Sequence, residues 1–451
     1  MSEYWEDKQK VEVVEECDIC VIGGSCTGVF AAVRASRMGA KVCIIENNGF
    51  FGGVATAGLV NVWHSLLDTN FDKSVIGGLT KEVIERLKYR NAVNELSNRP
   101  HVGFYLNTEE LKIELDELIK ESNVRPFLHA RFCSPIKDGE KLIGITIEDK
   151  SGRRGIKAKY FIDASGDADL VHRLGWTTHK DDAIQPPTLC AKISGIGKIQ
   201  ELNKDFNLSN AVFDPKYQES IDRGVLWTGK IPNAPDVTMV AGTRCHGVDV
   251  SNADELTLAE IEGRKQVRKI CDLMRNNFEG GKDIALLSLP TYIGSRESRH
   301  ADCIYKLNGE DILYGNRFDD AIGNGTYCSD IHFPDKSGLI FRYLDGREVT
   351  HQDGKRTEGR WRDESLEDPG FYQIPYRSLV PSQSRNVLVA GRSLDADAMA
   401  FGAVRVMVNC NQMGEAVGVA SAIALKDSCS VQDIDINELR ESLTYGGSEI
   451  I

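Results

Sequence analysis

Short apolar runs and a small-residue helix alternate over the first part of the chain. Residues 18–22 (DICVI) and 41–45 (KVCII) are apolar after their charged first residue, as expected for strands that are buried on both faces. Between them, residues 28–38 are rich in alanine, so a helix there can lie close to a sheet, and Gly39 is placed to end it. The pattern predicts a β-α-β unit in a parallel sheet with helices on both faces.

A second helix and a meander of strands are expected next. Residues 108–121 place leucines and Ile119 on one helical face, and Asn107 with Glu110 suits a capping box. The segments FLHARFCSPI, KLIGITIED and GIKAKYFIDA are separated by the turns KDGE and KSGRR and alternate like antiparallel strands. The last segment continues into FIDASGDADL (161–170).

The pattern changes in the middle of the chain and returns at its end. Residues 170–380 hold fewer helical patterns and many loops with proline and glycine. Residues 385–392 (RNVLVAGR) are typical of another buried strand that ends in glycine, and residues 403–424 predict a closing helix. We therefore expect an α/β fold in which residues 1–169 and 381–451 build one domain and residues 170–380 form an inserted domain.

Length and charge narrow the class of protein. The chain has 451 residues, more than one ordinary core accommodates, and 41% of them are hydrophobic. The net charge is −13 with no offsetting Lys/Arg stripe, which argues against a nucleic-acid binder. The charge does not restrict the substrate, because a basic pocket can lie inside an acidic protein.

Further features give expectations for location. The first segment, MSEYWEDKQKVEVVEECD, lacks the apolar core of a signal peptide, and Arg405, Asn409 and Glu415 suit a buried helix better than a membrane span. Twelve cysteines without paired spacing fit free thiols in a reducing compartment, and no C-x2-C-x2-C run suggests an iron–sulfur cluster. We expect a cytoplasmic protein without a membrane span or a metal site.

Residues 23–28 (GGSCTG) form a glycine-rich turn between the first strand and the first helix. They match the G-x-G-x-x-G pattern except that Ser25 replaces its middle glycine, and Glu46 lies at the end of the next strand, 23 residues after Gly23. Backbone N–H groups at such a helix start bind a pyrophosphate, and the carboxylate accepts both hydroxyls of an unphosphorylated ribose. The Ser25 hydroxyl can donate a hydrogen bond to the phosphate. The motif predicts dinucleotide binding and leaves NAD and FAD open.

Later blocks decide between the two dinucleotides. In order along the chain they are GFFGGVATAG (49–58), RESRH (296–300), FDDAI (318–322) and the 390–407 segment from AGRS to VRVM. With these blocks the chain resembles the bacterial FAD-dependent oxidoreductases that have a glutathione-reductase-type flavin domain. Ser25, Cys26 and His300 depart from the usual pattern. The resemblance implies a Rossmann-type FAD-binding domain, with a parallel sheet and an antiparallel meander, and an inserted mixed α+β cap domain.

The resemblance also implies which residues hold FAD without a covalent bond. It places one group on the pyrophosphate, Glu46 on the adenosine ribose, and the 403–424 helix with its start at the flavin C2 carbonyl, where it stabilises charge on the reduced ring. Asn47, next to Glu46, is a further expected contact. The pyrophosphate group is Gly23, Gly24, Ser25, Thr27 and Gly28, and Cys26 among them is a further expected cofactor contact. The remaining expected contacts are Gly52, Gly53, Ala55, Thr56, Ala130, Arg131, Ser165, Gly166, Asp167, Gly391, Arg392, Val404 and Arg405.

Candidate catalytic groups come from the polar clusters of the insert. Arg296 and Arg299, three residues apart, can clamp a carboxylate, or they can belong to a structural ion-pair network at a domain junction. His300 and His332 are the leading acid/base candidates, with His64 a third. Arg405 either adds positive charge at the flavin or faces the substrate.

Two absences shape the predicted reaction. No cysteine pair lies where a disulfide reductase needs one, and no second glycine-rich β-α-β unit is present for a nicotinamide cofactor. These features favour hydride exchange between flavin N5 and a small polar or anionic substrate, with oxygen, a quinone or a protein as the other electron partner. The alternative is an FAD-carrying electron-transfer or scaffold subunit. A flavin monooxygenase ranks behind both, because the RESRH and FDDAI blocks do not resemble that family.

Overall fold

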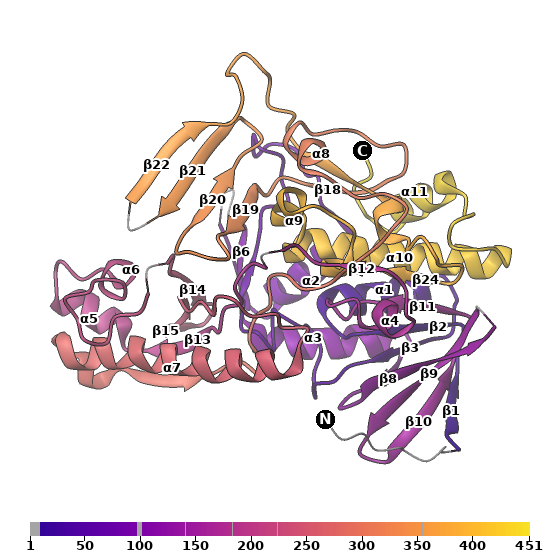
Figure 1. Cartoon of the computed structure of the whole chain (residues 1–451), viewed down its shortest axis with the longest axis horizontal. Helices are drawn as coiled ribbons and strands as arrows, with labels where there is room; N and C mark the ends of the chain where they lie inside the picture. Colours follow the sequence, from indigo (N-terminus) through magenta and orange to yellow (C-terminus); the bar gives the residue numbers. More distant parts are fainter. Residues whose placement is uncertain (1–9, 97–101, 140, 183, 223, 353–354) are drawn as a thin grey trace.

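Five short strands form a parallel sheet that both ends of the chain help to build (Figure 1). The computed structural model describes residues 10–96, 102–139, 141–182, 184–222, 224–352 and 355–451. The sheet has the order β24-β11-β2-β3-β7, and all neighbouring strands run parallel. Its strands are β2 (Ile19–Ile22), β3 (Val42–Ile45), β7 (Arg125–Phe127), β11 (Tyr160–Asp163) and β24 (Val387–Val389).

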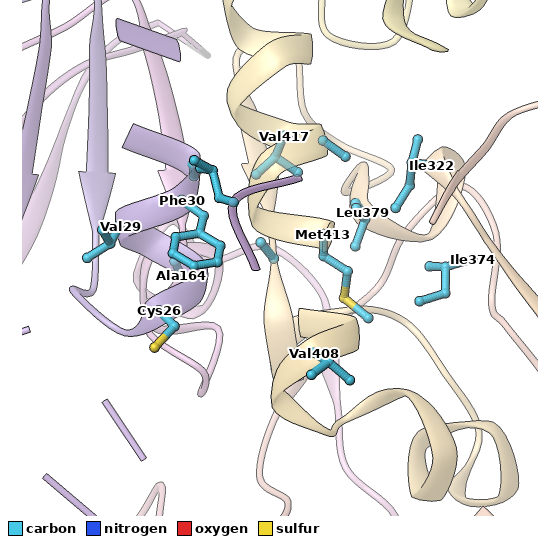
Figure 2. Packing of buried hydrophobic residues seen from close by; sticks show 14 of the residues in the cluster. Cys26, Val29, Phe30, Ala164, Ile322, Ile374, Leu379, Val408, Met413 and Val417 are labelled. Carbon is cyan, nitrogen blue, oxygen red and sulfur yellow. The ribbon is translucent and has the colours of Figure 1, made fainter. Parts of the chain in front are cut away.

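The first helix, α1 (Cys26–Arg37), packs tightly against α10 (Met407–Asp427) from the other end of the chain. A Cβ at Gly414 would lie 2.1 Å from the Thr27 carbonyl oxygen, and one at Gly418 would lie 2.3 Å from that of Ala31. Only glycine therefore permits this approach. Figure 2 shows α10 between α1, which carries Phe30, and the segments that carry Ile322 and Leu379.

The predicted meander is a second sheet with the order β1-β10-β9-β8. Its strands are β1 (Glu12–Glu16), β8 (Arg131–Asp138), β9 (Lys141–Asp149) and β10 (Gly152–Lys157). The expectation that its last strand runs on through residue 163 is wrong. The chain leaves this sheet after β10 and joins the parallel sheet as β11, since all four residues of β11 are buried and suit a central strand.

The longest helix among the described residues, α7 (Ala253–Asn277), lies in the middle segment, where we expected few helices. Asn252 caps it by accepting hydrogen bonds from the N–H groups of Asp254 and Glu255. Its buried face covers a sheet with the order β14-β15-β13-β16, and a separate hydrophobic cluster, from Leu189 to Ile293, lies between them. These strands are β13 (Ala191–Ser194), β14 (Trp227–Ile231), β15 (Ala234–Ala241) and β16 (Ala285–Ser288), and two short helices, α5 (Ile196–Leu202) and α6 (Leu208–Ala211), lie beside them (Figure 1).

Further short elements connect these parts. Asn107 caps α3 (Thr108–Glu121) as predicted, although it accepts from the N–H of Glu109, one residue earlier than a capping box with Glu110 requires.

The small sheets are β4 (Val62–Trp63) with β5 (Val93–Glu95) and β6 (Phe104–Leu106), β12 (Thr178–His179) with β17 (His300–Ala301), and β18 (Ala321–Gly325) with β23 (Tyr372–Pro375). A four-stranded sheet contains β19 (Ser329–His332), β20 (Leu339–Arg342), β21 (Arg347–Gln352) and β22 (Lys355–Arg360). The remaining helices are α2 (Gly78–Tyr89), α4 (Asp169–Arg173), α8 (Gly309–Leu313), α9 (Ala398–Val404) and α11 (Ile436–Tyr445), with single 3₁₀ turns at Gly281–Asp283, Tyr376–Leu379 and Gly391–Ser393.

The domain boundaries 1–169, 170–380 and 381–451 stay a prediction. Ile322 and Leu379 belong to the same hydrophobic cluster as α1 and α10, so the later part of the insert shares its core with the two chain ends. Among the described residues, no helix is both long and apolar enough to cross a membrane. Nor do any three His, Cys, Asp or Glu side chains in that part of the chain gather as a metal site would require.

Candidate functional site

The glycine turn after β2 is held in a conformation that side chains would prevent. Gly23 has φ +101°, and a Cβ there would lie 2.4 Å from the Ala164 carbonyl oxygen. A Cβ at Gly28 would lie 1.9 Å from the Gly23 carbonyl oxygen. The turn therefore needs glycine at both positions, and it presents the first N–H groups of α1 at the carboxyl end of the sheet.

Ser25, the departure from the usual pattern, is the N-cap residue of α1. Its Oγ accepts a hydrogen bond from the N–H of Gly28 at 3.4 Å, so serine has a structural use at this position. The hydroxyl hydrogen remains available to an anion at the helix start. Cys26 and Thr27 form the first turn of α1 and are both buried.

Glu46 lies at the end of β3 beside this turn. One carboxylate oxygen accepts from the N–H of Gly24 at 2.8 Å, and the other accepts from the N–H and the side-chain amide of Asn48, both at 2.7 Å. Burial raises the pKa of the Glu46 carboxyl, and these N–H groups partly offset the rise. The N–H of Ala130 bonds to the Glu46 carbonyl oxygen at 3.0 Å, which brings Ala130 beside Glu46. Arg131 follows as the first residue of β8, and Asn47 is exposed.

The second glycine turn, residues 52–56, packs against the first. The N–H of Gly52 bonds to the Gly24 carbonyl oxygen at 2.8 Å, and a Cβ at Gly53 would lie 2.6 Å from that of Ser25. Thr56 bonds through its hydroxyl to the Phe51 carbonyl oxygen, and Ala55 is fully buried. These last two side chains are packed inside the turn, and their contact with FAD stays a prediction.

Ser165, Gly166 and Asp167 meet Gly391 and Arg392 across the sheet. Buried Asp163 holds the first loop by accepting hydrogen bonds from both Ser165 and the N–H of Leu170. A Cβ at Gly166 would lie 2.7 Å from Nη2 of Arg392, and that nitrogen is 3.5 Å from Oδ1 of Asp167. The Nε of Arg392 is buried and has no hydrogen-bond partner among the described residues.

Tyr292 is a residue of this site that we did not predict. The N–H of the preceding Thr291 bonds to the Ala57 carbonyl oxygen at 2.8 Å, which fixes the segment over the second glycine turn. Burial raises the pKa of the Tyr292 phenol, and the nearby charge of Glu46 adds to the rise. The sequence PTYIGS around Tyr292 carries no motif that points to this position.

The predicted helix over 403–424 is broken in two. The structure has α9 (Ala398–Val404), a bend at Arg405 and Val406, and then α10 (Met407–Asp427). The break is stabilised because the Ala403 carbonyl oxygen accepts from the side-chain amide of Asn409 and from the Tyr372 hydroxyl, both at 3.1 Å. Arg405 therefore ends α9 instead of lying in the first turn of the long helix, and Val404 is fully buried.

A cavity of ≈ 310 Å³ lies at the start of α10. Val406 and Met407 line it, and no side chain caps the first N–H groups of α10, so the positive end of the helix dipole faces the cavity. Arg392 and Val54 connect it to the glycine turns, and the insert supplies the opposite side.

Two arginines converge at one side of the cavity. Nη1 of Arg296 donates to Thr188 Oγ1 and to the Pro186 carbonyl oxygen, both at 2.6 Å, and Nη1 of Arg244 donates to the same Oγ1 at 2.8 Å. Burial lowers the pKa of Arg244 to about 10, and burial with the charges of Arg244 and Arg405 lowers the pKa of Arg296 well below its ordinary value. In the described part of the chain neither guanidinium forms an ion pair with a carboxylate. We did not predict Arg244 from the sequence.

Arg405, Asp330 and His332 form a second polar group in the cavity. Nη2 of Arg405 is 3.2 Å from Oδ2 of Asp330, which also accepts from the Tyr327 hydroxyl at 3.0 Å. Nε2 of His332 is 3.4 Å from Oδ1 of Asp330. Burial, followed by the charges of Arg296, Arg244 and Arg405, lowers the pKa of His332 well below its ordinary value, so its imidazole is neutral at pH 7.

Of the other predicted catalytic residues, Arg299 and His300 lie outside the cavity and His64 lines it. Arg299 bonds to Asp169 and to the Asp167 carbonyl oxygen, so the expected clamp between Arg296 and Arg299 does not form. His300 is buried beside His179 and Phe401, with Nδ1 3.0 Å from the Leu394 carbonyl oxygen, and it does not line the cavity. His64 does line the cavity.

These features define a dinucleotide-binding α/β protein with a cavity beside the glycine turns. The sequence matches the FAD dependent oxidoreductase family model over residues 18–443. The chain belongs to this family and is a FAD-dependent oxidoreductase, so the predicted cofactor, enzyme class and Rossmann-type fold are confirmed. No curated protein matches the sequence significantly.

Solved structures with a similar course of the chain are distant in sequence. A geranylgeranyl bacteriochlorophyll reductase-like protein from Thermoplasma acidophilum has 13% identity and a TM-score of 0.49, with coverage of 96% of this chain and 83% of that one. The p-nitrophenol 4-monooxygenase of Pseudomonas putida has 11% identity, a TM-score of 0.47 and coverage of 96% and 87%. A flavoprotein/dehydrogenase from Cytophaga hutchinsonii has 14% identity, a TM-score of 0.46 and coverage of 95% and 83%. Likenesses of this size bear on neither substrate nor reaction.

The residues present fit FAD. The cradle between Gly24, Ser25 and Gly53 has no room for added Cβ atoms, Glu46 stands at the position of a ribose acceptor, and Arg392 carries an unused buried donor. The uncapped start of α10 meets the cavity where a flavin ring needs positive potential.

Proposed function

We propose that this enzyme exchanges a hydride with a small anionic organic substrate bound in the cavity at the start of α10. The observation that carries the proposal is the pair Arg244 and Arg296, which are half-buried where they line the cavity and form no ion pair with a carboxylate among the described residues. A buried charge without a counter-ion costs several kcal/mol, roughly, so the pair favours an anion from outside. We also place the chain in the family's motif group defined by the 49–58, 296–300, 318–322 and 390–407 blocks.

We propose that one set of residues holds FAD. Glu46 takes the adenosine ribose, with Ala130 and Arg131 beside the adenine, and Arg392 with Tyr292 closes the middle of the cleft. The pyrophosphate contacts come from Gly23, Gly24, Ser25, Thr27, Gly28, Gly52 and Gly53, with Ser165, Gly166, Asp167 and Gly391 opposite.

Bound FAD supplies a two-electron acceptor or donor at its N5. The chain supplies the rest: the start of α10 stabilises negative charge on the ring, and Arg296 with Arg244 orients the substrate. His332 exchanges the proton, because a neutral imidazole accepts one and the adjacent Asp330 carboxylate stabilises the protonated form. An external electron partner completes the cycle.

Anaerobic titration of the purified yellow protein tests the proposal. Small carboxylic acids that carry an oxidisable alcohol or amine should bleach the flavin absorbance, and uncharged analogues should not. Reduction by a partner protein but by no small molecule would instead support an electron-transfer subunit, and equal bleaching by the uncharged analogues would overturn the anionic substrate.

A further inference from the structure

The cavity has one strongly polar side and a largely apolar remainder. Thr188 anchors the polar side, since its Oγ1 accepts from both Arg244 and Arg296 and donates to the Thr243 carbonyl oxygen at 3.0 Å. Reciprocal backbone bonds between Thr188 and Gly294, at 3.0 and 2.8 Å, fix this hydroxyl relative to the 294–296 segment. The hydroxyl has no further capacity, so both arginines are held in place without being neutralised.

The charges around the cavity are not equally available to a ligand. Arg405 is paired with Asp330 at 3.2 Å, and Arg392 lies 3.5 Å from Asp167. Arg296 uses only Nη1 in its protein hydrogen bonds, which leaves Nε and Nη2 without a partner in the described part of the chain. These two nitrogens form the edge of a guanidinium that binds a carboxylate through two parallel hydrogen bonds.

The remaining walls are mostly apolar, although His64, Thr228 and Tyr327 add polar groups to them. They consist mainly of Val60, Val62, Val225, Trp227, Leu339 and Phe341. A sugar or a dicarboxylate would leave hydroxyls or a second charge against this surface unpaired, at a cost for each group. An aliphatic or aromatic body would instead gain from burial there.

Given the proposed function, we propose that the substrate is an apolar monocarboxylic acid. Its carboxylate binds the Nε–Nη2 edge of Arg296 with support from Arg244, and its hydrophobic body lies against Trp227, Phe341 and the valines. Different residues bind the carboxylate and the hydrophobic body of the substrate, so the contribution of each to the binding free energy can be measured separately.

Calorimetric titration of the FAD-loaded protein with four probes tests this assignment. Benzoate should bind at least about tenfold more tightly than acetate, which lacks the body, and than benzamide, which lacks the charge. Phthalate should bind more weakly than benzoate, because its second carboxylate meets the apolar wall. The proposal would be overturned if acetate or benzamide bound as tightly as benzoate. It would also be overturned if phthalate bound more tightly than benzoate.

Two variants separate the two halves of the site. Arg296→Met should weaken benzoate and acetate alike by about 10- to 100-fold, the value of a charge-assisted pair. Trp227→Ala should weaken benzoate by about tenfold and leave acetate unchanged. The control is Arg264→Met, which removes an exposed arginine of α7 that pairs with Glu260 and should leave benzoate binding within about twofold.

Folding and cofactor content are read in the same samples. Circular dichroism and flavin absorbance establish that each variant is folded and loaded, and Arg296→Lys replaces Arg296→Met if the latter is not, with the same loss expected because lysine lacks the two-nitrogen edge. A protein that binds benzoate as described but is never bleached by any small molecule would refute the proposed hydride exchange and leave the ligand assignment standing. A protein whose flavin is bleached by small polar acids but that does not bind benzoate would refute the ligand assignment and leave the proposed hydride exchange standing.

Discussion

The cofactor side and the cavity side of this site are built in different ways. Gly23, Gly28, Glu46 and Gly53 lie within one stretch of about thirty residues, and their positions follow from a single β-α-β unit. Thr188, Arg244, Arg296, His332 and Arg405 come from five separate segments. The first side depends on backbone that comes close because Cβ atoms are missing, whereas the second depends on charged side chains that the tertiary structure assembles. Variants of the two sides should therefore fail in different ways.

The largest effect is expected for Gly28→Ala on the cofactor side. The new Cβ would lie 1.9 Å from the Gly23 carbonyl oxygen, so the turn has to open. We expect complete loss of bound FAD, measured as flavin absorbance per protein. The control is Gly197→Ala in α5, where no atom lies within 4 Å of the added Cβ; it should change stability by no more than about 1 kcal/mol. A Gly28→Ala protein that keeps its colour and melting temperature would refute the conclusion that the cofactor side depends on missing Cβ atoms.

A buried arginine with a carboxylate partner should behave as part of the scaffold. Arg34 in α1 has Nε 3.4 Å from Oε2 of Glu415 and donates to the carbonyl oxygens of Gly446 and Leu443. Arg34→Met removes the partner of a buried charge, so we expect a loss of about 3 kcal/mol in the free energy of unfolding by urea titration. Unchanged stability would show that this contact between α1, α10 and the C-terminal segment is not structural.

Glu415 should make the scaffold sensitive to pH. Burial raises its pKa to about 7, despite the opposing effect of Arg34, against 4.5 for an unperturbed glutamate. The folded state therefore holds the proton more tightly, and the stability gained is full below pH 4.5 and is lost as pH rises through 7, by up to about 3 kcal/mol. Urea titrations from pH 5 to pH 8 should show this decline, and Glu415→Gln should flatten it. Exposed Glu441→Gln is the control and should follow the wild type.

The smallest expected effect is a gain in stability, caused by a substitution in the cavity. Arg296 is half-buried and forms no ion pair among the described residues, and only the more distant charge of Asp330 opposes the effect of burial, so Arg296→Met removes a weakly compensated charge. We expect the ligand-free protein to gain about 1 kcal/mol of stability, in contrast to the loss in Arg34→Met. A drop as large as that of Arg34→Met would make Arg296 a structural residue like Arg34.

What the sequence could predict follows the same division. Glu46 and the glycine turns could be predicted because their spacing is dictated by one strand and one helix. Arg244, Thr188 and Tyr292 could not, because nothing near them in sequence indicates that they meet residues about fifty or more positions away. The pairing of Arg296 with Arg299 failed for this reason: neighbours in sequence face different partners.

Two local errors have definite causes. The helix expected over 403–424 is interrupted because Asn409 and Tyr372 bond to the Ala403 carbonyl oxygen, a contact that periodicity does not reveal. Helix α7 was not predicted because charged residues are interspersed among its apolar positions. Asn252 before Asp254 and Glu255 is nevertheless a recognisable start signal.

The contacts that hold Arg296 and the apolar wall of the cavity lie on different strands and loops, so each can be varied without removing the other. Trp227 lies on β14 and Ala241 on β15, whereas Thr188 and Pro186 hold Arg296. Exchanging bulky for small residues on those two strands should enlarge the cavity and leave the contacts of Arg296 in place. A library confined to β14 and β15 is therefore a direct route to new chain-length preferences in this scaffold.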